Sequence, residues 1–224
     1  DRVVIGSSEE KAICIIKKLY DPFLIKNDRL IIMSNKEAEL VKYAANSMLA
    51  TKISFINEIS NICDKLNVDV ENIRKGIGSD SRIGYSFIYP GIGYGGSCFE
   101  KDIVALINTS ESLDLNPILL KAVSTRNNFQ KQIVNKKISI RFKNIENKSF
   151  GIWGLSFKPQ TDDVRNASSI DIIDYLLKNN CKIRVFDPIA NDKIKQIYKN
   201  HRNSNQIIFC NNQYDATKNV NALI

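Results

Sequence analysis

The sequence is poor in histidine and in closely spaced cysteines. It contains one histidine, His201, and no two of its five cysteines are separated by only two residues. Structural and catalytic zinc sites depend on clusters of these side chains, so no metal site is expected. His201 lies in a polar stretch, residues 199–203, where we expect an exposed loop residue rather than a general acid or base.

Long apolar runs are also lacking. No run reaches the roughly 18 residues that a membrane-spanning helix requires, and residues 1–6 resemble neither a signal peptide nor the start of a translated chain. The cysteines are odd in number and widely spaced, at positions 14, 63, 98, 181 and 210, as free thiols of a reducing compartment would be. We therefore expect a cytoplasmic protein that contacts no membrane.

Acidic residues are fewer than basic ones, 24 against 32, which gives a formal net charge of +8. An excess of this size suits an anionic partner, either nucleic acid or a phosphorylated small molecule. The basic residues form only short clusters between apolar positions, such as Lys17 with Lys18 and Lys136 with Lys137, a pattern typical of solvated helix faces. Without a basic stripe, nucleic-acid binding is not expected, and a phosphorylated small molecule is favoured.

Hydrophobic periodicity divides the 224 residues into three parts and predicts an α/β protein. Residues 1–33 have the pattern of strand, helix and strand, a βαβ unit too small to fold alone, so we expect the tail of a domain that begins upstream. Residues 34–143 have mainly helical patterns. Residues 144–224 alternate strands with helices, which predicts a parallel sheet, and they end inside an apolar run that resembles a further strand.

The middle part opens with the longest helical pattern of the chain. Ser34 and Glu37 have the spacing of a capping box, and apolar residues follow at helical intervals. A helix this long and apolar is typical of a subunit interface, so residues 34–66 are expected to form a homodimer or a higher homo-oligomer. Shorter helices are predicted at residues 69–77 (ended by Gly76 and Gly78), 98–111 and 118–142.

Residues 78–97 have no regular periodicity but are rich in glycine and aromatic residues. Loops this long in a compact domain are commonly functional. The loop leads to Cys98, where Ser97 and Glu100 repeat the capping-box spacing, so Ser97 is the expected N-cap and Cys98 lies in the first helical turn. Unpaired amides and the helix dipole favour a thiolate there. Cys98 is therefore the strongest candidate for a nucleophile, with a buried structural cysteine as the alternative.

Two further pairs share a helix face with i, i+4 spacing. Asp102 follows Cys98 by one turn, where a carboxylate can orient a water molecule or accept a proton. Lys42 and Asn46 have the same spacing on the long helix, where a cation and an amide could together stabilise a developing oxyanion. A solvated lysine is the alternative interpretation of the second pair.

Residues 151–157 follow a predicted strand and precede a helix, as a dinucleotide fingerprint does. Trp153 stands where the second glycine would let the backbone approach a pyrophosphate, and Asp187 lies too far along the chain for a ribose carboxylate. The third part is therefore expected to be Rossmann-like but without a standard NAD site. Four charged residues in the following loop suit phosphate or hydroxyl contacts, with a solvated loop as the alternative: Lys158, Asp162, Asp163 and Arg165.

Two of these motifs have counterparts in a known family. Gly95-Gly96-Ser97-Cys98-Phe99 with Lys101-Asp102 is similar to the nucleophile motif of the UDP-glucose/GDP-mannose dehydrogenase family, and Phe157-Lys158-Pro159 with residues 161–165 is similar to its carboxyl-terminal signature. The resemblance covers the whole chain. It implies the tail of an NAD-binding Rossmann domain in residues 1–33, a helical dimerisation domain in 34–143 and an incomplete UDP-sugar-binding Rossmann-like domain in 144–224.

The resemblance also implies an activity and roles for single residues. The expected activity is the NAD-dependent four-electron oxidation of UDP-glucose to UDP-glucuronate, through a thiohemiacetal and a thioester on Cys98. Lys42 and Asn46 would stabilise the oxyanions, and Asp102 would assist proton or water handling. The substrate is expected to bind Lys42, Arg82 from a neighbouring subunit, Phe87, Tyr89, Gly95 and Lys158, and NAD is expected to bind Lys101 and Arg165.

Some alternatives stay open within the resemblance. Residues 77–84 with Phe87 and Tyr89 resemble the UDP-glucose branch more than the GDP-mannose or UDP-N-acetylhexosamine branches. The dinucleotide motif of the family, and the threonine and glutamate that complete its active site, lie upstream of any residue present here. The chain by itself is therefore expected not to turn over, and a non-catalytic dimerising remnant is the second hypothesis.

Overall fold

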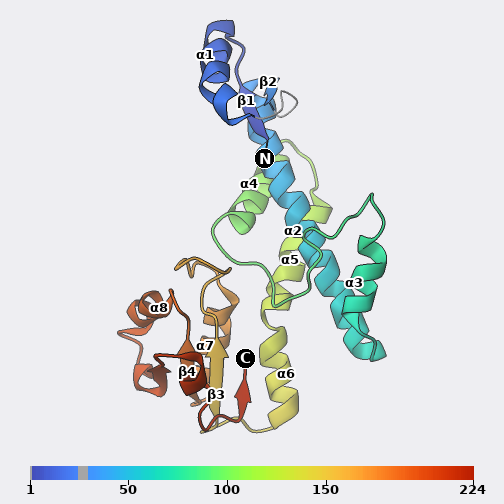
Figure 1. Cartoon of the computed structure of the whole chain (residues 1–224). Coiled ribbons are helices and arrows are strands. Elements are labelled where there is room, and N and C mark those ends of the chain that lie inside the picture. Colours follow the sequence, from blue (N-terminus) through green and yellow to red (C-terminus); the bar gives the residue numbers. More distant parts are fainter. Residues whose placement is uncertain (1, 25–29) are drawn as a thin grey trace. The chain divides into compact units, whose positions relative to one another are not determined.

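The computed structural model describes residues 2–24 and 30–224 (Figure 1). The chain divides into two compact units, one that ends at Met48 and one that comprises Leu49–Ile224. The boundary falls inside α2 (Asn35–Leu66), a single helix of 32 residues. This division cuts the chain at a different place from the three expected parts, 1–33, 34–143 and 144–224, which remain a prediction.

The first unit contains the expected βαβ pattern. Strand β1 (Val3–Gly6) pairs in parallel with β2 (Leu30–Met33), and α1 (Glu10–Tyr20) and the 3-10 turn η1 (Asp21–Phe23) lie between them in sequence. Ser34 and Glu37 form the predicted capping box, since the Ser34 amide donates to Oε2 of Glu37 at 2.8 Å and the Glu37 amide donates to the Ser34 hydroxyl at 3.4 Å. Residues 1 and 25–29 of the predicted strand, helix and strand pattern lie outside the described residues.

The second unit holds the rest of α2 and four more helices before its sheet: α3 (Val70–Gly78), α4 (Phe99–Ser112), α5 (Ile118–Lys131) and α6 (Ile133–Phe142). Helix α3 ends at Gly78, one residue beyond the predicted end, whereas Gly76 lies inside the helix. Gly78 is also required for packing, since a Cβ atom there would come within 2.5 Å of the Tyr85 ring.

The predicted single helix over residues 118–142 is wrong. It is interrupted at Gln132, whose backbone has φ −90° and ψ 0° and separates α5 from α6. The Gln132 side chain donates to the Asp171 carboxylate at 3.2 Å. A contact with a residue so distant in sequence leaves no local signal for the break.

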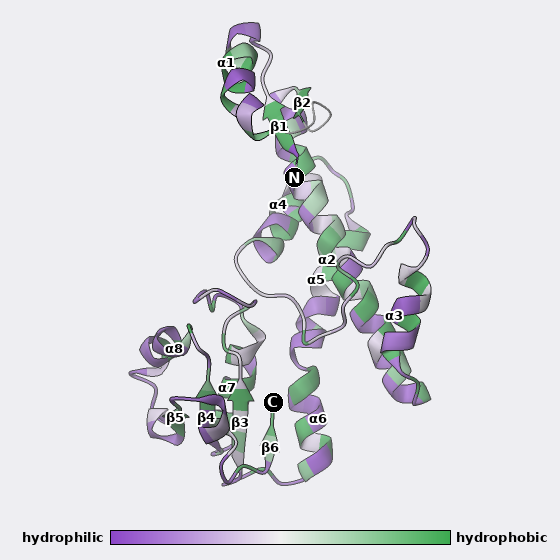
Figure 2. Cartoon of the chain, in the orientation of Figure 1, coloured by the Kyte–Doolittle hydropathy of each residue, from purple (hydrophilic) through white to green (hydrophobic). Residues whose placement is uncertain are grey.

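The last part of the second unit is a parallel sheet of four strands, as predicted for an α/β protein. Its order is β5–β4–β3–β6, and each pairing is parallel. Strand β3 is buried along its centre and is hydrophobic in part (Figure 2), with Phe150 and Ile152 0% and 2% exposed, as expected of an inner strand of a parallel sheet. The elements are β3 (Ser149–Trp153), α7 (Ser168–Lys178), β4 (Lys182–Phe186), α8 (Asn191–Tyr198), η3 (Ser204–Gln206), β5 (Ile207–Phe209), α9 (Gln213–Ala216) and β6 (Ala222–Leu223).

Asp187, at the carboxyl end of β4, has a structural role. Its side chain is 5% exposed and accepts hydrogen bonds from the amides of Leu155 (2.7 Å), Ser156 (3.3 Å), Ile189 (2.8 Å) and Ala190 (2.8 Å). Burial raises the pKa of this carboxyl, but the four backbone hydrogen bonds outweigh burial and hold the pKa below its ordinary value. The carboxylate therefore joins the loop after β3 to the loop after β4.

Residues 2–24 and 30–224 contain neither a candidate membrane-spanning helix nor a candidate metal-binding cluster. No helix in these ranges is both long and apolar enough to cross a membrane. No three histidine, cysteine or acidic side chains there are grouped so that they could hold a metal ion. His201 is half-buried rather than exposed, because its ring packs edge-on against Tyr198 with centroids 5.8 Å apart.

Candidate functional site

Cys98 lines a cavity of about 740 Å³ in the second unit. The cavity is within the size range of pockets that take small ligands. The glycine-rich loop supplies most of the wall, the α2 residues Ile53 and Asn57 supply another part, and residues 157–159 close it from the loop after β3. Four predicted substrate residues line this one cavity: Phe87, Tyr89, Gly95 and Lys158.

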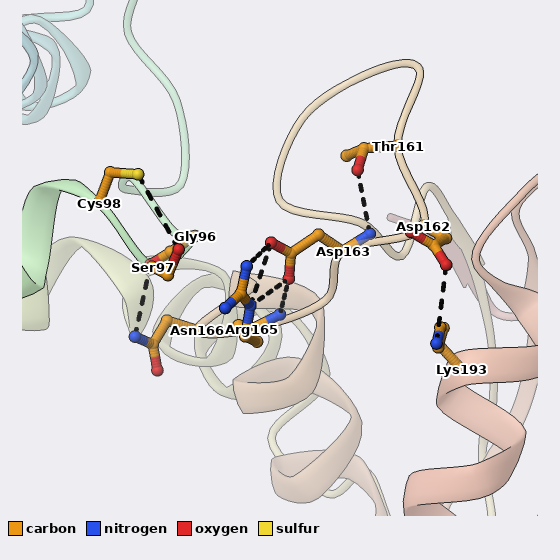
Figure 3. Close-up of polar contacts among 9 residues, drawn as sticks. All are labelled: Gly96, Ser97, Cys98, Thr161, Asp162, Asp163, Arg165, Asn166 and Lys193. Carbon is orange, nitrogen blue, oxygen red and sulfur yellow. Dashed lines mark hydrogen bonds and ion pairs between the residues drawn. The ribbon is translucent and has the colours of Figure 1, made fainter.

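Cys98 is exposed and is itself the N-cap residue of α4, with φ −89° and ψ −57°. The prediction that Ser97 caps the helix and that Cys98 lies in the first turn is therefore wrong by one residue. The Ser97 hydroxyl lies 3.9 Å from the sulfur of Cys98 (Figure 3), and it does not cap the helix. The thiol consequently stands at the positive end of the helix dipole, which favours an anion at this position.

Asp102 lies one turn beyond Cys98, as predicted. Its amide donates to the Cys98 carbonyl at 2.9 Å, and its carboxylate is completely buried, 3.8 Å from Nζ of Lys101. Its part in proton or water handling remains a prediction.

Aromatic rings form much of the cavity wall. Phe99 meets Phe87 and Tyr94 edge-on, with ring centroids 6.5 Å and 5.5 Å apart. The Arg74 guanidinium lies 4.3 Å from the centroid of the Tyr89 ring. Burial, followed by the charge of Glu100, raises the pKa of Tyr94 to about 12, so that hydroxyl stays neutral in the physiological range.

The two predicted cofactor residues, Lys101 and Arg165, line a second pocket of about 620 Å³. Asp163 fixes Arg165 through two parallel contacts, from Nε to Oδ1 at 2.9 Å and from Nη2 to Oδ2 at 2.6 Å (Figure 3). These hydrogen bonds lower the pKa of Asp163 to about 2. Ser97 lies at the edge of the same pocket.

Three predicted site residues are not among the residues that line this cavity: Lys42, Asn46 and Arg82. Lys42 and Asn46 lie on α2 in the first unit, whereas Cys98 belongs to the second, so their roles remain predictions. The Arg82 side chain is 87% exposed and is paired with Asp80, with Nη2 and Oδ2 2.6 Å apart. Arg82 is not among the residues that line the cavity.

Three of the residues that line the cavity were not predicted from the sequence: Ile53, Asn57 and Phe157. Asn57 could have been found, since it is a polar residue one turn after Ile53 on a mostly apolar helix, and it is 1% exposed. Phe157 packs beneath the loop, where a Cβ atom on Gly96 would lie 2.8 Å from its ring.

Gly95→Ala is expected to disrupt the site. A Cβ atom at Gly95 would lie 2.4 Å from the backbone carbonyl oxygen of Asn166, a contact that no side-chain rotation can relieve. We expect Cys98 to become alkylated by iodoacetamide at a changed rate, with the unfolding midpoint also lowered. Gly91→Ala is the matched control, because no atom lies within 4 Å of its Cβ position, and equal effects of both changes would contradict the steric argument.

Two domain models of one protein family match the chain. Residues 36–129 match the central domain of the UDP-glucose/GDP-mannose dehydrogenase family, and residues 151–224 match its UDP binding domain. The chain belongs to this family. Residues from both of these matched domains line the cavity beside Cys98.

Several relatives in the family are similar over most of the chain. The UDP-glucose 6-dehydrogenase of Pseudomonas aeruginosa is 41% identical, with 100% of this chain and 50% of the relative covered. UDP-glucose 6-dehydrogenase YwqF of Bacillus subtilis is 46% identical over 88% of this chain and 44% of its own length. The solved UDP-glucose dehydrogenase of Pyrobaculum islandicum is 33% identical with a TM-score of 0.91, covering 100% of this chain and 50% of that one. The chain spans about half the length of the curated relatives it matches.

Proposed function

We propose that this chain contains the nucleophile and the sugar-nucleotide site of an NAD-dependent UDP-glucose 6-dehydrogenase, which oxidises UDP-glucose to UDP-glucuronate. The proposal rests on the cavity of about 740 Å³, which is lined by Cys98 together with Phe87, Tyr89 and Lys158. The names of the Pseudomonas and Bacillus relatives support UDP-glucose as the substrate. Lys158 supplies a cation for the nucleotide, and the aromatic rings supply apolar surface.

In the proposed reaction Cys98 acts after the sugar alcohol has been oxidised to an aldehyde. Its thiolate attacks the aldehyde carbon and forms a C–S bond, while the carbonyl oxygen takes up a proton. Removal of hydride from that carbon, together with loss of the hydroxyl proton, leaves a thioester on Cys98. Water then attacks the thioester, the C–S bond breaks, and the thiolate is released with the carboxylate product. Lys42 and Asn46 stabilise the oxyanions, and Asp102 assists the water.

NAD, when bound, accepts the hydride at each of the two oxidations. Lys101 and Arg165 fit this cofactor, since both line the pocket of about 620 Å³ beside Ser97 and both carry the positive charge that suits a diphosphate. We propose that these two residues hold the phosphates of NAD. Asp163 orients Arg165 for this contact.

We propose that the protein assembles at least as a homodimer through α2. Phe55, Ile62 and Leu66 are 55%, 49% and 67% exposed, and their i, i+7, i+11 spacing puts them on one face of the helix. An apolar stripe of this kind is typical of a helix that packs against another copy. In such an assembly Arg82 reaches the sugar nucleotide of the neighbouring subunit.

UDP-glucose is expected to protect Cys98 of this chain from iodoacetamide, and Lys158→Ala is expected to raise the concentration for half-protection about tenfold or more. The reason is the loss of one charge-assisted contact with the nucleotide. Peptide mapping by mass spectrometry separates Cys98 from Cys14, the other exposed thiol. Lys199→Ala removes an exposed lysine outside the cavity and is the control.

The same measurement tests the alternatives. Stronger protection by GDP-mannose or a UDP-N-acetylhexosamine would move the proposal to another branch of the family. Absence of protection by any nucleotide sugar would reject the substrate site and favour the non-catalytic dimerising remnant.

A further inference from the structure

The backbone of the loop before Cys98 is held by buried carboxamide side chains. The Gly91 amide donates to Oδ1 of Asn57 at 2.7 Å, and Nε2 of Gln130 donates to the Gly91 carbonyl at 2.7 Å. Both backbone groups of one glycine, in a segment without helix or strand, are therefore bonded to side chains from α2 and α5.

The same arrangement recurs three residues later. The Tyr94 amide donates to Oδ1 of Asn127 at 2.8 Å, and Nδ2 of Asn127 donates to the Tyr94 carbonyl at 3.0 Å. The Asn127 carboxamide thus pairs with one residue in both directions, as an adjacent strand would. Because one partner is a donor and the other an acceptor, the orientation of the amide group is settled.

Burial makes these contacts costly to lose. Asn57, Asn127 and Gln130 are 1%, 3% and 3% exposed, and a buried polar atom that loses its hydrogen-bond partner pays the cost of desolvation. Oε1 of Gln130 accepts from Asn61 at 2.8 Å and from Arg126 at 2.9 Å, which leaves its amino group directed at Gly91. These side chains are therefore matched to this loop rather than merely enclosed in the core.

We propose that Asn57, Asn127 and Gln130 are positioning residues that act on Cys98 through the backbone of residues 91–96. The other end of this segment is also tied, since the Gly96 amide donates to the Arg165 carbonyl at 2.8 Å. A glycine-rich loop would otherwise sample many conformations, and a nucleophile must be held close to its attacking geometry. The inference rests on the proposed function only in what Cys98 attacks.

Asn127→Asp and Gln130→Glu test the proposal with little change of shape. Each variant keeps the acceptor oxygens but, when ionised, loses the donor to the loop carbonyl. At neutral pH we expect the UDP-glucose concentration that half-protects Cys98 to rise about tenfold in each, as for one lost hydrogen bond. In Asn127→Asp the effect should disappear on acidification, because the protonated carboxyl can donate to Tyr94 again. Asn128→Asp, on the exposed neighbouring residue of α5, is the control.

Circular dichroism shows whether each variant folds. If only one of Asn127→Asp and Gln130→Glu folds, the test of the inference rests on that variant. Folded variants that match Asn128→Asp at every pH would overturn the inference. If UDP-glucose fails to protect the unaltered chain, the proposed function fails separately. The inference is then judged from the ligand-free alkylation rate of Cys98, taken relative to the unaltered chain at each pH. The inference is supported if the alkylation rate in Asn127→Asp differs from that of the unaltered chain at neutral pH and returns to it in acid. Any other result contradicts the inference.

Discussion

Replacement of Cys98 by serine is expected to abolish the net oxidation of UDP-glucose, with a loss on the order of 10³-fold or more. A serine hydroxyl is hardly ionised near neutral pH, whereas a cysteine can supply a thiolate. The change is nearly isosteric, and Cys98 is exposed at the start of α4, so the fold should be retained. Production of NADH from UDP-glucose, in the native polypeptide that contains these residues, measures the effect.

Cys14→Ser is the matched control for this experiment. Cys14 is an exposed thiol on α1, and its replacement should leave NADH production unchanged. Full activity in Cys98→Ser would refute the covalent mechanism. Equal losses in both variants would instead indicate that thiol removal damages the protein in a general way.

Asp187→Ala is expected to destabilise the second unit by about 3 kcal/mol or more. The change leaves four backbone amides without their acceptor at a site only 5% exposed, and each unsatisfied buried donor costs roughly 1–3 kcal/mol, reduced by water that enters the space. Urea unfolding followed by the fluorescence of Trp153 measures the difference. Asp162→Ala removes an exposed aspartate 3.7 Å from Lys193 and should change the free energy of unfolding by less than about 1 kcal/mol.

The pH dependence of this stability has a defined sign. Hydrogen bonding in the folded state holds the pKa of Asp187 below its ordinary value, about 3.9 for an unfolded chain. The contribution of Asp187 to the free energy of unfolding is therefore complete above the unfolded pKa, and it is lost as the pH falls through the lower folded pKa. Asp187→Asn should flatten this acid-dependent part of the unfolding free energy. An unchanged acid slope in Asp187→Asn would assign the loss to other carboxyls.

Patterns of residues close together in the sequence were sufficient to predict most of the helices and strands. The capping box of Ser34 and Glu37 marked the start of α2 because both partners lie within one helical turn. Strands β3 and β4 followed from short apolar runs between polar turns. The same local rule failed at Ser97, because its hydroxyl faces the Cys98 sulfur rather than the helix amides.

Spacing alone was ambiguous at the glycines. Gly76 was expected to help end α3 but lies inside it, and Gly78, its last residue, also makes room for Tyr85. A glycine in the sequence can indicate that a side chain is not tolerated at that position. The physical reason is visible only from the atoms that surround it in the folded structure.

The sequence by itself determined the order of helices and strands, the parallel α/β character of the last part, and Cys98 at a helix start as the candidate nucleophile. These features depend on periodicity, capping and turn residues that act over a few positions. The tertiary structure alone decided the break at Gln132, the role of Asp187, and the hold of Asn57, Asn127 and Gln130 on the loop before Cys98. Each of these depends on hydrogen bonds between residues more than thirty positions apart, which one sequence does not encode as a local pattern.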